Sequence, residues 1–200
     1  LLRLRGQAMQ RAVPFGEGAM AALLGLDFAD AKTIAEEAAA SGGVCTSAND
    51  NAPGHVVISG HKATVERAIE IAQDKGAKRA VLLPVSAPFH CPLMQSAAEE
   101  MKDALQDAEI KAPSVPLIAN VSAETTSDPD EIRSLLVQQV TGSVRWRESV
   151  MRMAELGVDE VVELGAGKVL TGLTRRIDKS LKGRAVGDVA SAESFAQDIS

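Results

Sequence analysis

The sequence predicts an α/β protein in which a ferredoxin-like β-α-β-β-α-β unit at 15–85 is inserted into a larger α/β subdomain formed by 1–14 and 86–200. Two observations support this prediction. Apolar segments typical of strands alternate with segments of helical period along the chain. Within 15–85 their order is strand, helix, strand, strand, helix, strand, and right-handed crossovers would then place both helices on one face of a single sheet.

The first helix is predicted at 1–12, where good helix formers continue until Pro14 and Gly16. Arg5 and Met9 are four residues apart and share a face of this helix. Asp27 and Asp30 are candidate N-caps for the next helix. The elements predicted after the first helix are a strand at 18–26, a helix at 31–38, strands at 44–48 and 55–59 around a turn at 49–54, a helix at 63–75 and a strand at 78–85.

Beyond Pro88 the pattern changes to longer helices. A long amphipathic helix is predicted at 92–108, and Asp128 followed by Pro129 predicts the start of another, with acidic residues where the helix dipole favours them. The remaining predicted elements are a strand at 115–120, helices at 146–156 and 165–181 around a strand at 160–164, and a last strand at 184–189.

Composition excludes several classes of protein. The 200 residues are 46% hydrophobic, which is enough for one or two buried cores. The formal net charge of −6 argues against a general nucleic-acid binder, which needs a basic face. No apolar run approaches about 18 residues, and the opening segment does not read as a signal peptide, so we expect a cytoplasmic protein without a membrane span.

The two cysteines and the first residue give further expectations about the chain. Cys45 and Cys91 form no C-x-x-C motif and lie among ordinary apolar residues, so we expect free thiols. The first residue is Leu1, inside a predicted helix, and we therefore expect a further N-terminal portion in the natural protein. We expect a monomer.

Two side chains are candidates for chemistry. His90 follows an apolar strand, a place where rigid scaffolds present catalytic groups, and imidazole suits proton transfer from a nucleophile. Arg5 offers a bidentate fork to a carboxylate. The residues alone leave alternatives open, because His90 also fits a structural role beside a proline turn and Arg5 a surface cation whose stem covers apolar area.

The other conspicuous motifs are weaker. Gly16-Glu17-Gly18 precedes a strand instead of following one, and the segment 165–168 lacks the first glycine and the final Ser or Thr of a phosphate loop. His55 and His61 have no acidic or thiol neighbours at ligand spacing, so no metal site is predicted.

A basic cluster lies near the end of the chain, and it fits either a solvated helix face or a docking patch for an acidic partner. Its members are Arg175, Arg176, Lys179 and Lys182.

Four separated segments give the chain a resemblance to a known family: LRGQAMQ at 4–10, NDNAPGHVVISG at 49–60, PVSAPFHCPLM at 84–94 and VELGAGKVLTGLTRRI at 162–177. They resemble the malonyl-CoA:acyl carrier protein transacylases and the related acyltransferase domains of polyketide synthases, in the family's order. The resemblance implies an α/β-hydrolase-like large subdomain, incomplete in these residues, with the ferredoxin-like unit as its small subdomain. The family's GPGKVL is GAGKVL here, with Ala166 for proline.

The resemblance also implies roles for individual residues. His90 would be the general base and acid of a Ser-His pair, and the backbone carbonyl of Gln139 would orient it. Arg5 would bind the malonate carboxylate, and Met9 and Asn51 would line the acyl pocket. Phe89 looks like the bulky residue associated with malonyl selection.

The implied reaction is transfer of malonyl from malonyl-CoA to the phosphopantetheine thiol of acyl carrier protein through a seryl ester, with the coenzyme A thioester as substrate and no metal or redox cofactor. The family's GQGSQ and GHSLGE segments, the latter holding the serine, are absent from these 200 residues. Two alternatives stay open: a polyketide-type acyltransferase for another acyl unit, or, for this fragment, a non-catalytic carrier-protein-binding module.

Overall fold

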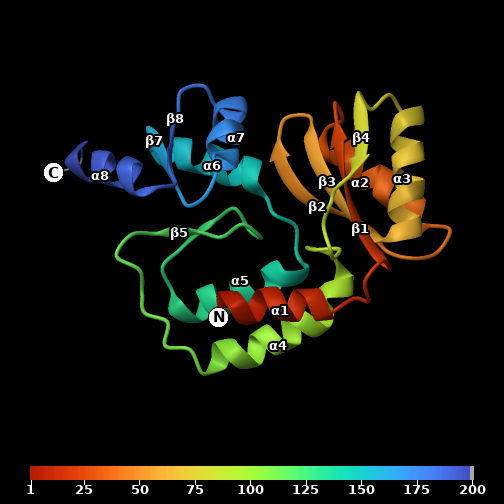
Figure 1. The fold of residues 1–200 in the computed structure, drawn as a ribbon, viewed down its shortest axis with the longest axis horizontal. Coiled ribbons are helices and arrows are strands. Elements are labelled where there is room, and N and C mark those ends of the chain that lie inside the picture. The colour runs from red at the N-terminus through yellow and green to blue at the C-terminus, as the bar shows by residue number, and fades with distance from the viewer. Residues whose placement is uncertain (199–200) are drawn as a thin grey trace. The chain divides into compact units, whose positions relative to one another are not determined.

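The computed structural model of the protein describes residues 1–198 (Figure 1). The chain folds into two compact units, and the boundary between them follows Trp146. The elements of the first unit are α1 (Leu2–Arg11), β1 (Gly18–Leu24), α2 (Phe28–Ala39), β2 (Cys45–Ala52), β3 (His55–His61), α3 (Lys62–Asp74), β4 (Arg79–Leu82), the 3-10 turn η1 (Pro92–Met94), α4 (Gln95–Gln106), β5 (Leu117–Ile118), β6 (Thr125–Thr126) and α5 (Pro129–Thr141).

The first unit contains a four-stranded sheet of order β2-β3-β1-β4, with antiparallel pairing throughout. Helices α2 and α3 cover one face of this sheet (Figure 1). This topology confirms the predicted ferredoxin-like unit and, with it, the predicted α/β fold class. The assignment of 1–14 and 86–200 to one larger subdomain stays a prediction.

Alanine fills much of the layer between the sheet and its two helices. Leu23, Ile34, Ile58 and Val65 are the large side chains at its centre, each 0% exposed. Around them lie alanines whose exposure is 1% or less: Ala21, Ala31, Ala35, Ala38, Ala68 and Ala72. Such small side chains allow helices and sheet to approach closely.

The prediction of a turn at 49–54 was wrong in extent, because β2 continues to Ala52. Asn and Asp in this stretch favour turns in sequence statistics. Here the backbone pairs with β3 across two irregularities, and Asp50 is only 1% exposed. The connection is reduced to Pro53 and Gly54, and Gly54 adopts the left-handed φ of 68° that a tight turn needs.

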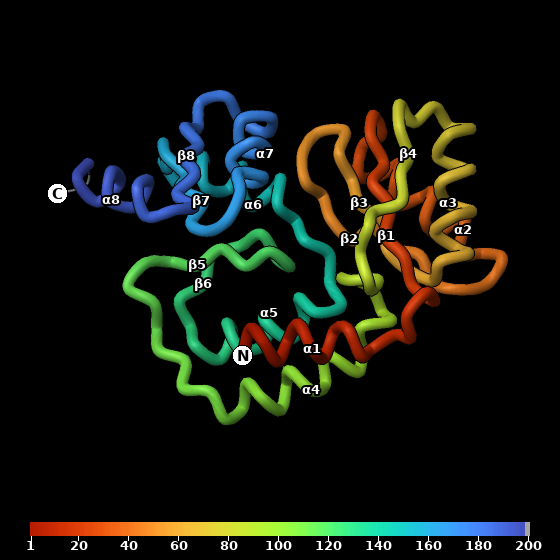
Figure 2. Tube along the Cα trace, in the orientation of Figure 1, coloured from red at the N-terminus to blue at the C-terminus, as the bar shows by residue number. Residues whose placement is uncertain are grey.

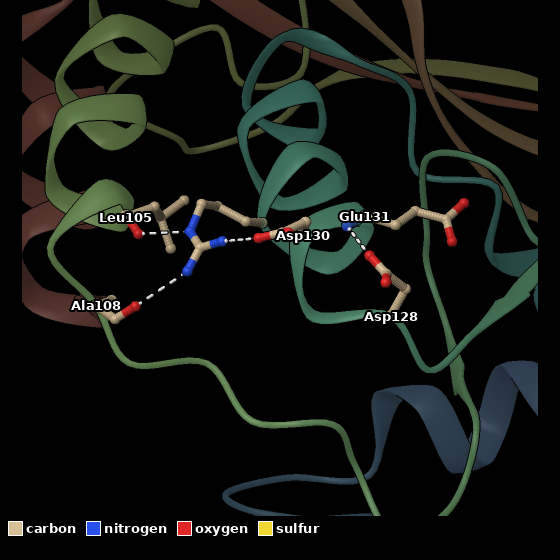
Figure 3. Close-up of polar contacts among 6 residues, drawn as sticks. Leu105, Ala108, Asp128, Asp130 and Glu131 are labelled. Atoms are coloured by element: carbon tan, nitrogen blue, oxygen red, sulfur yellow. Dashed lines mark hydrogen bonds and ion pairs between the residues drawn. The ribbon is translucent and has the colours of Figure 1, made fainter.

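Helices α1, α4 and α5 form a second layer of the same unit, with a core that includes Met9, Met94 and Leu105. The predicted long helix at 92–108 is divided into η1 and α4. Of the two candidate N-caps before α2, Asp27 is the cap and Asp30 is not, because the Asp27 carboxylate accepts from the Asp30 N–H at 2.8 Å. Asp128 caps α5 as predicted, and its carboxylate accepts from the Glu131 N–H at 2.7 Å (Figure 3).

Arg133 on α5 ties α5 to the end of α4. Its guanidinium donates to the carbonyls of Leu105 at 2.8 Å and Ala108 at 3.2 Å, and it pairs with Asp130 at 2.5 Å (Figure 3). The Leu105 carbonyl, at the end of α4, also accepts from the Ala108 N–H at 3.3 Å, so the guanidinium adds a donor to this carbonyl and binds the Ala108 carbonyl beyond the helix.

The second unit is built on a parallel strand pair. Its elements are α6 (Trp146–Glu155), β7 (Glu160–Leu164), α7 (Val169–Ile177), β8 (Lys182–Val186) and α8 (Val189–Asp198). Helix α7 connects β7 to the parallel β8 (Figure 2). Arg184 joins α8 to β8 through an ion pair with Asp198 at 2.6 Å and by lying 4.9 Å above the Phe195 ring.

Two predictions for this unit need correction, and one of its helices was missed. Helix α7 ends at Ile177 instead of near residue 181, because Asp178 turns extended and its carboxylate accepts from the N–H and Oγ of Ser180. Strand β8 therefore begins and ends earlier than the predicted 184–189. Helix α8 was not predicted at all.

Candidate functional site

His90 lies in the connection between β4 and α4, in an unusual backbone conformation. Its φ is 58°, in the left-handed region that few residues other than glycine adopt. Prolines stand two residues before and after it, and the buried thiol of Cys91 donates to the carbonyl of Pro88 at 3.1 Å. These contacts fix the backbone on both sides, and the half-buried imidazole is held at a defined place.

The imidazole contacts the end of α5. His90 Nδ1 lies 3.0 Å from the carbonyl oxygen of Gln139, which belongs to the last turn of that helix. Carbonyls of the last turn are free to accept from outside the helix, and an oxygen of this kind cannot donate. Nδ1 therefore carries the hydrogen, and Nε2 holds the lone pair when the ring is neutral.

The surroundings of His90 favour its neutral form. Burial is the main cause that lowers its pKa, and the positive charge of Arg5 lowers it further. The carbonyls of Gln139 and Gly142 act in the opposite direction by accepting from the ring. A histidine of this kind can accept a proton at neutral pH.

The sequence did not reveal Gly142 as part of this site. Backbone carbonyls carry no side-chain signature, and the only available signal was a glycine that follows a helix.

Arg5 lies on α1, half-buried, and burial lowers the pKa of its guanidinium. It remains a cation at any ordinary pH. Within residues 1–198 the guanidinium forms no ion pair or hydrogen bond, although its charge acts on His90. An arginine that is partly desolvated and unpaired is well suited to receive an anion from outside the chain.

The other predicted substrate-binding residues differ in position. Met9 is 2% exposed within the α1–α4–α5 core. Phe89 is half-buried and packs against that core and also against the cluster of Met20 and Val57 on the sheet. Asn51 is half-buried in β2, and no hydrogen bond of the described residues joins its side chain to His90 or Arg5.

The predicted basic cluster lies in the second unit, where Arg175, Arg176, Lys179 and Lys182 are all exposed. Three of them line a hollow of about 540 Å³ together with Lys168, and Arg176 does not. No acidic residue lines this hollow, and none of its four cations forms an ion pair in the part of the chain that the structure describes.

The glycine-rich segment before α7 is not a phosphate loop. The Glu163 carboxylate accepts from the N–H groups of Leu170 at 3.1 Å and Thr171 at 2.8 Å, and from the Thr171 hydroxyl at 2.7 Å. These hydrogen bonds lower the pKa of Glu163. A carboxylate of the chain itself thus occupies the helix N-terminus at which a phosphate would bind.

Among residues 1–198, no group of three or more His, Cys, Asp or Glu side chains is arranged to hold a metal ion. His61 has a structural contact, because its Nδ1 accepts from the Val44 N–H at 2.9 Å. In the same described part of the chain, no helix has both the length and the apolar character needed to cross a membrane.

Comparison with known proteins connects these features to one family. The acyl transferase domain matches residues 1–196. The malonyl CoA-acyl carrier protein transacylases of Bacillus subtilis (strain 168) and Escherichia coli (strain K12) are 42% and 47% identical over 99% and 94% of the chain. The solved acyl-carrier-protein-S-malonyltransferase of Bartonella henselae is 56% identical, with a TM-score of 0.93 over 99% of the chain and 63% of that structure.

A further similar structure is a malonyl-transacylase in complex with a type II PKS acyl-carrier protein, 41% identical with a TM-score of 0.93, of which the chain covers 64%. The chain spans 62% of the Bacillus subtilis protein and 60% of the Escherichia coli protein. The residues compared are thus about three-fifths of these relatives.

Proposed function

Because the chain belongs to the acyl transferase domain family, we propose that the protein transfers malonyl from malonyl-CoA to the phosphopantetheine thiol of acyl carrier protein through a seryl ester. The observation that carries the proposal is the hydrogen bond of 3.0 Å between His90 Nδ1 and the Gln139 carbonyl, because it leaves Nε2 as the base. The names of the curated relatives support the choice of substrates.

His90 would act in both halves of the reaction. Nε2 takes the proton of the serine hydroxyl as its oxygen attacks the thioester carbonyl, and the imidazolium returns that proton to the sulfur of coenzyme A when the carbon–sulfur bond breaks. The carrier thiol then attacks the ester, gives its proton to Nε2, and the serine oxygen recovers a proton as it leaves. By resemblance, the serine belongs to a GHSLGE segment that these 200 residues do not contain.

Arg5 would select the substrate by binding the free carboxylate of malonyl. Its half-buried guanidinium has no partner among the described residues, and its charge reaches His90, which supports a common site. Phe89 would limit the size of the acyl group, and Asn51 would line the acyl pocket. Met9, which is buried on the same helix as Arg5, would line this pocket too.

The basic cluster would dock the carrier protein. Arg175, Lys179 and Lys182 surround a hollow that lacks acidic residues, and Arg176 extends the charge beside it. Cations without partners favour an acidic protein and speed its association. We propose that the protein is a monomer and, because both substrates are water-soluble, that it acts in the cytoplasm. We also propose that the reaction needs no metal or redox cofactor, because serine-ester transfer involves only proton and acyl movements.

The test is malonyl transfer by the full-length protein, with His90→Gln compared with His61→Gln. We expect His90→Gln to reduce the rate by more than about 10³-fold, because a base that activates a nucleophile is lost, and His61→Gln to change it by less than about threefold. Equal rates for the two variants would reject His90 as the base.

A second candidate is loading of a polyketide-type carrier protein, favoured by the similar structure that contains a type II PKS acyl-carrier protein. A panel of acyl thioesters and of both kinds of carrier protein distinguishes it from the first. If the purified full-length protein binds carrier protein but forms no acyl ester detectable by intact mass, the protein is a binding module instead of an enzyme.

A further inference from the structure

Gln139 connects His90 to the turn that follows α5, through its backbone carbonyl on one side and its side-chain amide on the other. Its Nε2 donates to the carbonyl of Gly142 at 2.9 Å and makes a longer contact of 3.4 Å with the carbonyl of Ser143. Both partners are acceptors only, which fixes the orientation of the amide. The backbone carbonyl of the same glutamine accepts from His90 at 3.0 Å. One residue thus contacts the catalytic ring and the turn behind it.

Hydrogen bonds tie the turn after α5, which Gln139 contacts, to strand β2 of the sheet. The Ser143 hydroxyl donates to the Ser47 carbonyl of β2. The backbone of Val144 adds two hydrogen bonds of 2.8 Å, from its N–H to the Ala48 carbonyl and from the Asp50 N–H to its own carbonyl. Two main-chain hydrogen bonds and one from a side-chain hydroxyl therefore anchor the segment directly after α5 to an edge strand.

Gly142 is required at the bend between the helix and this anchor. A Cβ at position 142 would lie 2.7 Å from Val121 Cγ2 and 2.9 Å from the Gln138 carbonyl, which is too close for either contact. Its backbone is extended, with φ −90° and ψ 153°. The carbonyl of Gly142 accepts from the Gln139 amide, and it helps to raise the pKa of His90.

We propose that the Gln139 side-chain amide is a positioning group for His90, which holds the end of α5 so that the Gln139 carbonyl accepts from Nδ1 and Nε2 stays free for the nucleophile. The effect of this amide on catalysis rests on the proposed function, whereas its control of the His90 tautomer does not. Without the amide, its hydrogen bonds to the carbonyls of Gly142 and Ser143 are lost, and the Gln139 side chain no longer ties the end of α5 to the anchored segment. The ring then loses its fixed tautomer.

The variant Gln139→Met removes the amide and keeps the length of the side chain. Gln138→Met is the matched control, because Gln138 is the adjacent, exposed glutamine and its amide reaches only Ser134, at 3.0 Å. The measurement is ¹⁵N NMR of the histidine ring in the full-length protein, which distinguishes the Nδ1–H from the Nε2–H form. We expect the Nδ1–H form in the natural protein and in the control, and a mixture of both forms in Gln139→Met.

Activity gives a second readout. Gln139→Met should lower kcat about tenfold with less than a twofold change in KM, because it disturbs the base and not the binding of substrate. If Gln139→Met does not fold, Ser143→Ala removes one anchor of the same turn and should give the same mixture of tautomers in weaker form. If the His90 ring stays entirely in the Nδ1–H form in each of these two variants that folds, the proposal is overturned. If instead the ring changes its tautomer but His90→Gln retains full activity, the positioning holds and the proposed function fails.

Discussion

Replacing Arg5 by alanine in the full-length protein separates recognition of the substrate carboxylate from general damage to the site. The guanidinium is half-buried and has no partner among the described residues, so its loss leaves no other side chain unpaired. A hydrogen-bonded charged group contributes about 1.5–3 kcal/mol, and partial exposure places Arg5 below the 3–5 kcal/mol of a fully buried pair. We take about 2–3 kcal/mol, which corresponds to roughly 30- to 150-fold in kcat/KM.

The assay compares malonyl-CoA with acetyl-CoA as donor, because acetyl has no carboxylate. Malonyl transfer should fall by that factor, while acetyl transfer should change less than about threefold. Arg11→Ala is the control on the same helix, since Arg11 is exposed and pairs with Glu100 at 2.7 Å. Equal losses for both donors would refute the carboxylate role.

The same substitution also has a pH signature. Arg5 lowers the pKa of His90, although less than burial does, so Arg5→Ala should raise it. A base with a raised pKa is protonated up to a higher pH, so the acid limb of acetyl transfer should move to higher pH. Arg5→Lys keeps the charge and should leave the limb in place while still weakening malonyl transfer. An acid limb that stays in place in Arg5→Ala would show that the two residues do not share a site.

Three further predictions concern stability and reactivity. Arg133→Met should destabilise the protein by about 1–3 kcal/mol in chemical denaturation, because the guanidinium hydrogen bonds to the carbonyls of Leu105 and Ala108 are lost. An unchanged unfolding midpoint would contradict this. Because folding lowers the pKa of Glu163, this carboxylate stabilises the protein above its unfolded pKa, and the stabilisation is lost as the pH falls through its folded pKa. Acidification should therefore lower the thermal midpoint of the natural protein more than that of Glu163→Gln. Burial raises the pKa of the Cys45 thiol to about 12, so alkylation at pH 8 should be slow in the folded protein and fast in denaturant, and equally fast labelling in both would show that the thiol is accessible.

The sequence was most informative where the spacing of apolar residues and the N-cap residues indicated the same helix or strand. The order of elements in the four-stranded unit followed from alternating apolar segments, and Asp27 and Asp128 cap their helices as predicted. It failed at 49–52, where turn-forming residues are held in a strand by pairing on both sides, and at α8, whose only described ion pair to the strand beside it is made by Arg184. Tertiary contacts decided both cases, and local propensity does not contain them.

The candidate site was predictable only in part for a related reason. His90 stood out because it follows a strand within a proline-rich stretch, yet its partner is a carbonyl 49 residues away, and any residue carries such a group. The residue type at 139 was informative only through family resemblance. The role of its amide depends on where the chain turns after α5, which depends in turn on pairing with β2.

The alanine-filled layer between the sheet and helices α2 and α3 has a consequence for how this unit tolerates variation. Alanine loses no rotamer freedom on folding, so ordering this layer costs little side-chain entropy, although the backbone cost remains. The close packing also leaves no room for larger side chains. In a saturation mutagenesis screen, Ala35 and Ala68 should accept glycine or serine more readily than leucine or phenylalanine. Side-chain volume, more than hydrophobicity, would then limit the sequences compatible with this half of the fold.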